Sequence, residues 1–178
     1  MSQSAENFQL ADAIGAMTRQ RASGDQPGGD VFTVLLVDDD PDCRALIREA
    51  IGECGAKHVV IELGDGQAAI DYLKNKVATG GTRPGLIFLD LEMPRMNGLQ
   101  TLEAIKSHEQ LLDIPVVMMT GVADDAYIQQ AAVLGANSYT IKPANPEQFL
   151  RTVMTSTQYW LTVHQYPGRH MPQKEARR

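Results

Sequence analysis

Acidic residues stand directly after two apolar segments of the chain. Asp38 and Asp39 follow the run TVLLV, and Asp90 ends the run LIFLD. A lone carboxylate among buried apolar side chains is costly, so such a group needs a partner, a metal ion or contact with solvent. Two further apolar runs end in a hydroxyl, Thr120, and an ammonium, Lys142. Brought together, these groups would suit a divalent cation and a phosphoryl group.

The elements that must position these residues alternate along the chain. The predicted strands are TVLLV (33 to 37), HVVIEL (58 to 63), LIFLD (86 to 90), PVVMMT (115 to 120) and NSYTI (137 to 141). The predicted helices span about 45 to 55, 67 to 76, 99 to 107, 125 to 134 and 146 to 164. Continuous apolar strands between amphipathic helices indicate a doubly wound α/β domain, with a parallel sheet covered on both faces.

The strand order decides which strand ends meet. Periodicity does not distinguish the possible orders, but the flavodoxin-like order 2-1-3-4-5 is common for five strands and places ligands at the carboxyl ends. In that order strands one and three are neighbours, so Asp38 and Asp39 would lie close to Asp90. Three carboxylates there would repel one another unless a hard cation lay between them, and an all-oxygen site suits Mg²⁺.

These groups, in this chain order, match a known family. The acidic pair lies in LLVDDD, the next carboxylate in LIFLDLEMPRMNG, the hydroxyl in VVMMTG and the lysine in SYTIKP. Over about residues 31 to 163 the chain resembles the receiver domain of two-component response regulators, which is CheY-like in fold. One such motif alone is weak evidence, whereas four at strand ends in the same order are specific.

The resemblance assigns the metal site and the phosphoacceptor. Asp90 would accept the phosphoryl group. The Mg²⁺ ligands would be Asp39 directly, its acidic neighbour Asp38 through water, Asp90, and the backbone carbonyl of Glu92. The side chain of Glu92 is predicted to be exposed. The simplest alternative for the acidic run is helix capping, and Asp40, directly before a proline, is predicted to be such a cap.

The resemblance also implies a switch. Thr120 and Lys142 would contact the phosphoryl group, and Tyr139 would be the aromatic switch residue, although an aromatic residue in a sheet often only packs. The bond between Lys142 and Pro143 is commonly cis in the family, and the same is expected here.

The last predicted helix extends the resemblance. The segment NPEQFLRTVMTSTQYWLTVHQYP carries an apolar and aromatic helical stripe beyond the length of a minimal receiver. It is similar to the small receiver-only regulators that partner bacterial phytochrome histidine kinases. The implied partner is a sensor histidine kinase, of phytochrome type, or a phosphotransfer protein. Because this helix also carries Tyr159 and Trp160, we expect a homodimer; Trp160 could equally cover the core.

Two other functions remain open. A phosphohydrolase of haloacid dehalogenase type also uses an aspartyl nucleophile, but it has a second Asp two residues later, where this chain has Glu92. A flavodoxin-like cofactor carrier needs a phosphate-binding loop after the first strand, and DDDPD would repel a bare phosphate. The leading hypothesis is therefore a signalling protein whose own chemistry is limited to gaining and losing a phosphoryl group.

Length and charge limit the organisation and the partners. The 178 residues suffice for one full-sized core, and we predict a flexible extension at 1–29, the receiver domain at 30–164 and a tail at 165–178. A net charge of −6 argues against general binding to nucleic acid or anionic membranes. No apolar stretch approaches the roughly 20 residues of a membrane span. We therefore expect a cytoplasmic protein that acts through protein contacts.

Overall fold

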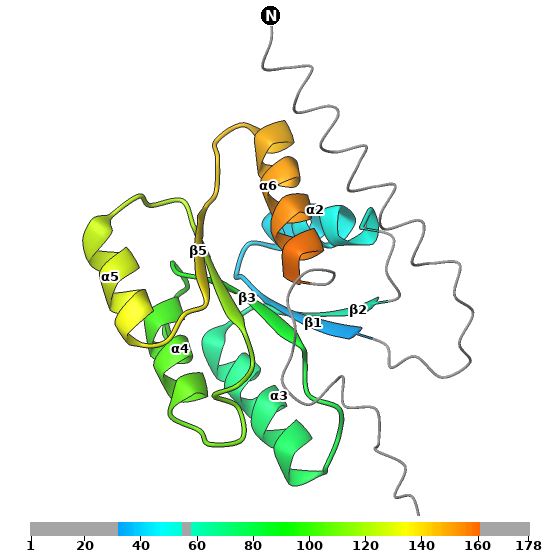
Figure 1. Ribbon diagram of the computed structural model, residues 1–178, viewed down its shortest axis with the longest axis vertical. Helices are drawn as coiled ribbons and strands as arrows, with labels where there is room; N and C mark the ends of the chain where they lie inside the picture. The colour runs from blue at the N-terminus through cyan, green and yellow to red at the C-terminus, as the bar shows by residue number, and fades with distance from the viewer. Residues whose placement is uncertain (1–31, 55–57, 161–178) are drawn as a thin grey trace, which may run out of the picture.

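The predicted alternation of strands and helices is confirmed by the computed structural model, which describes residues 32–54 and 58–160 (Figure 1). The strands are β1 (Phe32–Val37), β2 (His58–Leu63), β3 (Leu86–Asp90), β4 (Val116–Thr120) and β5 (Ser138–Ile141). The helices are α2 (Pro41–Gly52), α3 (Gly66–Ala78), α4 (Gly98–Lys106), α5 (Asp125–Val133) and α6 (Pro146–Gln158). The strands form one parallel sheet in the predicted order, β2-β1-β3-β4-β5.

Each helix begins at a short polar side chain that accepts a hydrogen bond from a backbone N–H of its first turn. These caps are Asp40, Asp65, Asn97, Asp124 and Asn145. They satisfy N–H groups that have no partner inside the helix. The predicted cap at Asp40 is thus confirmed, and α2 begins earlier than its apolar pattern indicated. Among the described residues, no helix is long and apolar enough to cross a membrane.

The helices form two layers, one on each face of the sheet (Figure 1). On one face α2 and α6 pack against each other and cover the side chains of β1, β3 and β4 that point their way. On the other face α3, α4 and α5 cover the alternate side chains of the same strands. Trp160, just past α6, is 5% exposed and belongs to the first of these cores. Its side chain therefore covers the core.

The predicted ends of the chain fall outside the described residues. The extension 1–29, the tail 165–178 and the last part of the helix predicted to reach residue 164 are not among them. The domain limits at 30 and 164 therefore stay predictions.

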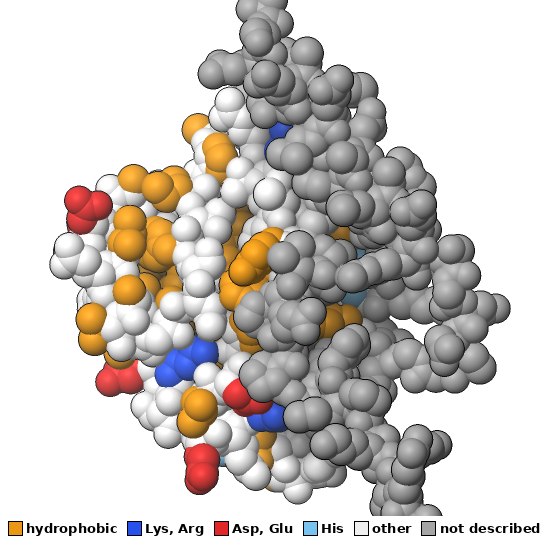
Figure 2. All heavy atoms as spheres, viewed as in Figure 1, with side chains coloured by type: hydrophobic (Ala, Val, Ile, Leu, Met, Phe, Trp, Pro, Cys, Tyr) orange, Lys and Arg blue, Asp and Glu red, His pale blue; other side chains and the backbone are white. Residues whose placement is uncertain are grey.

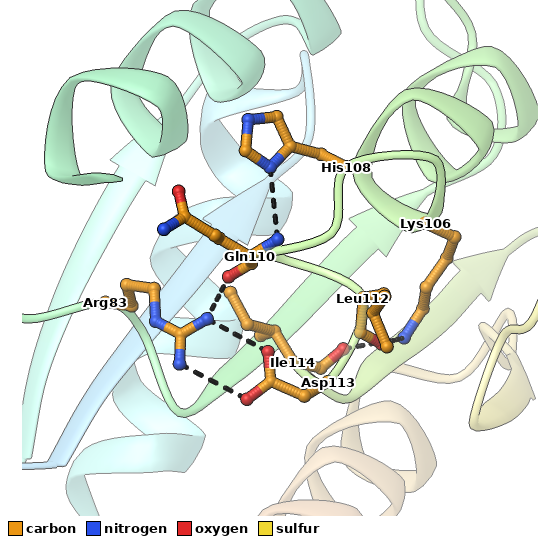
Figure 3. Close-up of polar contacts among 7 residues, drawn as sticks. All are labelled: Arg83, Lys106, His108, Gln110, Leu112, Asp113 and Ile114. Carbon is orange, nitrogen blue, oxygen red and sulfur yellow. Dashed lines mark hydrogen bonds and ion pairs between the residues drawn. The ribbon is translucent and has the colours of Figure 1, made fainter. Parts of the chain in front are cut away.

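The edge of the sheet at the amino ends of the strands is fixed by side chains that bind loop backbone (Figure 3). The ammonium of Lys106 donates to the carbonyl oxygens of Leu112, at 3.0 Å, and Ile114, at 2.7 Å. Arg83, before β3, pairs with Asp113 at 2.9 Å. These contacts hold the loops that enter β3 and β4, and so fix where both strands start.

The register aligns the opposite ends of the strands. Val37 is paired with Leu89, so the residues that follow them, Asp38 and Asp90, come side by side. Thr120, the last residue of β4, is paired with Ile141, the last of β5. The carboxyl ends of four strands thus meet at one edge.

Gly98 gives a test of how tightly this edge is packed. A Cβ at this position would lie 2.2 Å from the carbonyl oxygen of Asp90 and 2.8 Å from Cα of Leu91, closer than such atoms approach. We expect Gly98→Ala to lower the free energy of unfolding by about 2 kcal/mol or more in urea denaturation. In the matched control Gly52→Ala, a Cβ would meet nothing within 4 Å. This control should keep or gain stability, and equal losses in both variants would contradict the prediction.

Candidate functional site

Asp38 lies at the end of β1 and is only 1% exposed. One carboxylate oxygen accepts a hydrogen bond from the backbone N–H of Asp40 at 2.9 Å. The other accepts from the ammonium of Lys142 at 2.7 Å. A buried carboxylate persists as an ion only when it is paired in this way, so the buried charge at the end of β1 depends on the loop after β5.

Asp90 lies at the end of β3 and is 6% exposed. Its Oδ1 is 2.8 Å from Nζ of Lys142. Burial raises the pKa of Asp90 to about 6, against the lowering effect of Lys142, and the charges of Asp38 and Asp39 raise it further. The side chain is therefore a carboxylate at neutral pH, but one whose charge the fold tolerates poorly.

Lys142 thus pairs with two carboxylates at once. Burial alone would lower its pKa, but the hydrogen bonds and charges of Asp38 and Asp90 outweigh burial and raise the pKa above its ordinary value. The backbone N–H of Lys142 donates to the carbonyl oxygen of Thr120, which ties this loop to β4. The expectation of a cis bond before Pro143 is wrong, because no described peptide bond is cis. The lysine reaches both carboxylates with a trans bond.

Carboxylate oxygens of Asp38, Asp39 and Asp90 lie within 4.8 Å of one another. Two of the three residues are buried, whereas Asp39 is exposed. One ammonium cannot balance three carboxylates, so the cluster keeps an excess of negative charge. An all-oxygen donor set with excess negative charge and one solvent-facing side fits a hard divalent cation such as Mg²⁺ or Mn²⁺.

Glu92 follows β3, and its side chain is exposed, as predicted. The carboxylate is not among the three that form the acidic cluster. Its Oε2 lies 3.9 Å from the place that a Cβ on Gly121 would take. The side chain therefore leans over the loop after β4, at the rim of the site.

Thr120 and Tyr139 are joined through a residue that sequence reasoning missed. The hydroxyl oxygen of Thr120, which is fully buried, accepts a hydrogen bond from the backbone N–H of Val122 at 3.0 Å. The hydroxyl of Tyr139 donates to the carbonyl oxygen of Val122 at 3.3 Å. Burial raises the pKa of Tyr139, and a hydrogen bond with Thr120 opposes this rise. Apolar Val122 gave no signal in the sequence because only its backbone takes part.

Two residues of α2 also lie close to the site. Nη1 of Arg44 donates to the backbone carbonyl oxygen of Asp38 at 2.6 Å. The Cys43 thiol interacts with Asp38, and burial raises the pKa of this thiol to about 12. A thiol with this pKa stays protonated at neutral pH, so Cys43 is not a second nucleophile.

The raised pKa of Asp90 predicts a pH-dependent stability in metal-free protein. On folding, this pKa rises from 3.8 to about 6. The folded state then binds the proton more tightly than the unfolded state, so stability falls as pH rises from about 4 to about 6. We expect Asp90→Asn to remove this decline, about 2 to 3 kcal/mol, in urea denaturation with a chelator present. Asp113→Asn, at the amino ends of the strands, should keep the decline of stability with pH. A decline of the same size in Asp90→Asn as in wild type would contradict the assignment.

Comparisons with known proteins agree with this geometry. The sequence model of the response regulator receiver domain family matches residues 34–154 of this chain. The chain is 37% identical over 139 residues to the probable methanogenesis regulatory protein FilR2 of Methanothrix harundinacea, covering 78% of this chain and 90% of that protein. It is 30% identical over 136 residues to the response regulator Rcp1 of Synechocystis, covering 76% of this chain and 92% of that protein.

Solved structures give the same result. The phosphorylated cyanobacterial phytochrome response regulator RcpA has a TM-score of 0.73 at 32% identity, covering 77% of this chain and 99% of that chain. The Mn²⁺-bound form of Rcp1 has a TM-score of 0.71 at 30% identity, covering 76% of this chain and 99% of that chain. The predicted similarity to phytochrome response regulators is confirmed, and nothing in these matches supports the haloacid dehalogenase alternative. Matches that extend over the whole sheet and its helices show that the chain belongs to the response regulator receiver domain family.

Proposed function

We propose that this response regulator accepts a phosphoryl group on Asp90 from a sensor histidine kinase and passes the signal on through protein contacts. One observation carries the proposal. Asp90 is a nearly buried carboxylate at a strand end, held 2.8 Å from a lysine and beside two further carboxylates. Such a group is a nucleophile placed where positive charge can be supplied to a phosphoryl group.

The chemical step follows from the positions of these groups. An oxygen of Asp90 forms a bond to phosphorus while the bond between phosphorus and the imidazole nitrogen of a phosphohistidine breaks. The electron pair of the broken bond stays on the imidazole, which leaves neutral when its other nitrogen carries a proton. Mg²⁺, held by Asp38, Asp39, Asp90 and the backbone carbonyl of Glu92, would neutralise charge on the transferred group. The Mn²⁺-bound structure of Rcp1 supports a divalent ion at this site.

Lys142 and Thr120 contact the phosphoryl group once it is on Asp90. The ammonium of Lys142 shifts from the carboxylate of Asp90 toward the phosphoryl oxygens, where negative charge accumulates. The hydroxyl oxygen of Thr120 accepts from Val122. Its own proton, which interacts with Tyr139, can turn toward a phosphoryl oxygen. A shift of Thr120 toward the product alters its hydrogen bond to Val122, and the hydrogen bond of Tyr139 to the same residue changes with it. Tyr139 is thus the proposed switch residue.

The relatives suggest the partners. RcpA is a phytochrome response regulator, and at 32% identity it supports a phytochrome-type histidine kinase, or a phosphotransfer protein, as the donor for this chain. With such a donor the chain would act in the cytoplasm. We propose no further enzymatic activity. The net charge of −6 supports protein partners over nucleic acid or membranes.

The acceptor assignment can be tested with a small phosphodonor. We expect wild-type protein with Mg²⁺ and phosphoramidate to gain one phosphoryl group by intact mass, and hydroxylamine to remove it, as for an acyl phosphate. Asp90→Asn should gain none because an amide is not a nucleophile here. Glu92→Gln is the matched control and should still be phosphorylated. Phosphorylation of Asp90→Asn to the wild-type level would overturn the proposal.

We also propose that the protein forms a homodimer through the face that includes α6. Tyr159 is 49% exposed, beside a groove of about 610 Å³ between β5 and α6. Hydrophobic side chains also gather over helix α5, on the other face of the sheet (Figure 2), whose exposed large hydrophobic residues are Tyr127 and Val133. In the proposed dimer, Tyr159 and the side chains that line the groove supply the contact area.

Light scattering tests the dimer. We expect wild-type protein to have the mass of two chains, with or without a phosphoryl mimic, and Tyr159→Ala to weaken association because apolar contact area is lost. The control is Val59→Ala, at a position 45% exposed on β2, the outer strand farthest from β5. A monomeric mass for wild-type protein in both states would rule out the dimer.

A further inference from the structure

The peptide groups on both sides of Asp38 are held by neighbouring elements. Its N–H donates to the carbonyl oxygen of Leu63, the last residue of β2, at 3.1 Å. Its carbonyl oxygen accepts from Nη1 of Arg44, in α2, at 2.6 Å. The bond from Arg44 is short and charge-assisted, and such hydrogen bonds are about twice as strong as neutral ones. Because its carboxylate is also paired, the N–H, the carbonyl oxygen and the side chain of Asp38 all have hydrogen-bond partners.

The carbonyl of Asp38 belongs to the peptide plane that joins it to Asp39. A hydrogen bond that fixes this plane also fixes the direction in which the chain leaves Asp38. Asp39 is the exposed member of the acidic cluster, so packing does not hold its side chain in place. The orientation of the plane before it therefore helps to set the direction from which its carboxylate reaches the other two.

The guanidinium of Arg44 is itself held in place. Its Nε lies 3.7 Å from Oε2 of Glu62 in β2, and Oε1 of the same carboxylate is 2.6 Å from Nη1 of Arg48. Gly64 borders the guanidinium, and a Cβ there would be in ordinary van der Waals contact with Nη1, at 3.7 Å. Glu62 thus holds Arg44 from β2, and Arg48 lies on the far side of Glu62 without contacting Asp38.

We propose that Arg44 is a positioning residue for the acidic pair, which raises the affinity of the site for a divalent cation by orienting the peptide between Asp38 and Asp39. The inference rests on the proposed function of this site. A purely electrostatic role predicts the opposite sign. A guanidinium close to a cation site repels the ion, so its removal would then tighten binding.

Calorimetric titration with Mg²⁺ distinguishes the two roles. We expect Arg44→Met to weaken Mg²⁺ binding by about tenfold, as is typical when a residue that orients a metal ligand is removed. Arg48→Met removes the same charge from the same helix and from the same carboxylate, but leaves the contact with Asp38. It should change the affinity by less than about twofold, since exposed ion pairs contribute little.

Further variants separate positioning from charge and from folding. Arg44→Lys keeps the charge but not the planar fork, so it should restore only part of the affinity. In metal-free protein, the amide resonance of Asp39 should shift in Arg44→Met and stay in place in Arg48→Met. Circular dichroism shows whether each variant is folded. If Arg44→Met is unfolded, Glu62→Gln provides the test and should weaken binding several-fold.

The outcomes also separate this inference from the proposed function. Unchanged or tighter Mg²⁺ binding in folded Arg44→Met, or an equal loss in Arg48→Met, overturns the positioning role while Asp90 remains the acceptor. Wild-type protein that neither binds Mg²⁺ nor accepts a phosphoryl group overturns the proposed function itself.

Discussion

The ammonium of Lys142 between the carboxylates of Asp38 and Asp90 is the contact on which the rest of the site depends. Distances of 2.7 Å and 2.8 Å leave no room for water between the charges. Without the lysine, two buried carboxylates on neighbouring strands would repel each other in a medium that screens poorly. The residues of one ion pair lie 104 positions apart in the sequence. The contact therefore forms only when β1, β3 and β5 share one sheet in the observed order.

The contacts at the amino ends of the strands stabilise the fold, whereas the groups at the carboxyl ends are arranged for reaction. At the amino ends of the strands, Lys106 and Arg83 bind loop backbone and an exposed carboxylate, so both of these cations have stabilising partners. At the carboxyl ends, three carboxylates compete for one ammonium, and the pKa of Asp90 is raised to about 6. Groups assembled for reaction commonly cost stability in this way. The well-packed far edge and the two cores offset that cost.

The polar groups at the carboxyl ends of the strands could be predicted from the sequence itself, whereas the sheet order came from a common five-stranded arrangement and the family resemblance. Parallel strands all end at the same edge, so Asp90, Thr120 and Lys142 could be placed together from their positions after apolar runs. The start of α2 was predicted by its cap at Asp40 and not by apolar periodicity, which begins inside the helix. The trans bond before Pro143 and the contact between Arg44 and a backbone oxygen depend on tertiary geometry, which leaves no trace in residue type or spacing. The apolar stripe of the last helix left two alternatives open for Trp160, and its burial decides for the core.

Signal transmission in the proposed mechanism depends on how the charge of Asp90 is redistributed. Before transfer, the negative charge lies on an oxygen paired with Lys142, inside the edge of the sheet. Afterwards it lies on phosphoryl oxygens farther out, so Lys142 and Thr120 are drawn in the same direction. The hydroxyl oxygen of Thr120 accepts a hydrogen bond from the backbone N–H of Val122, and the carbonyl oxygen of Val122 accepts one from Tyr139. Because these links are single hydrogen bonds of 3.0 Å and 3.3 Å, they can rearrange at small cost while both cores stay intact. The switch can therefore be local, confined to β5, the end of β4 and the loops that follow these strands.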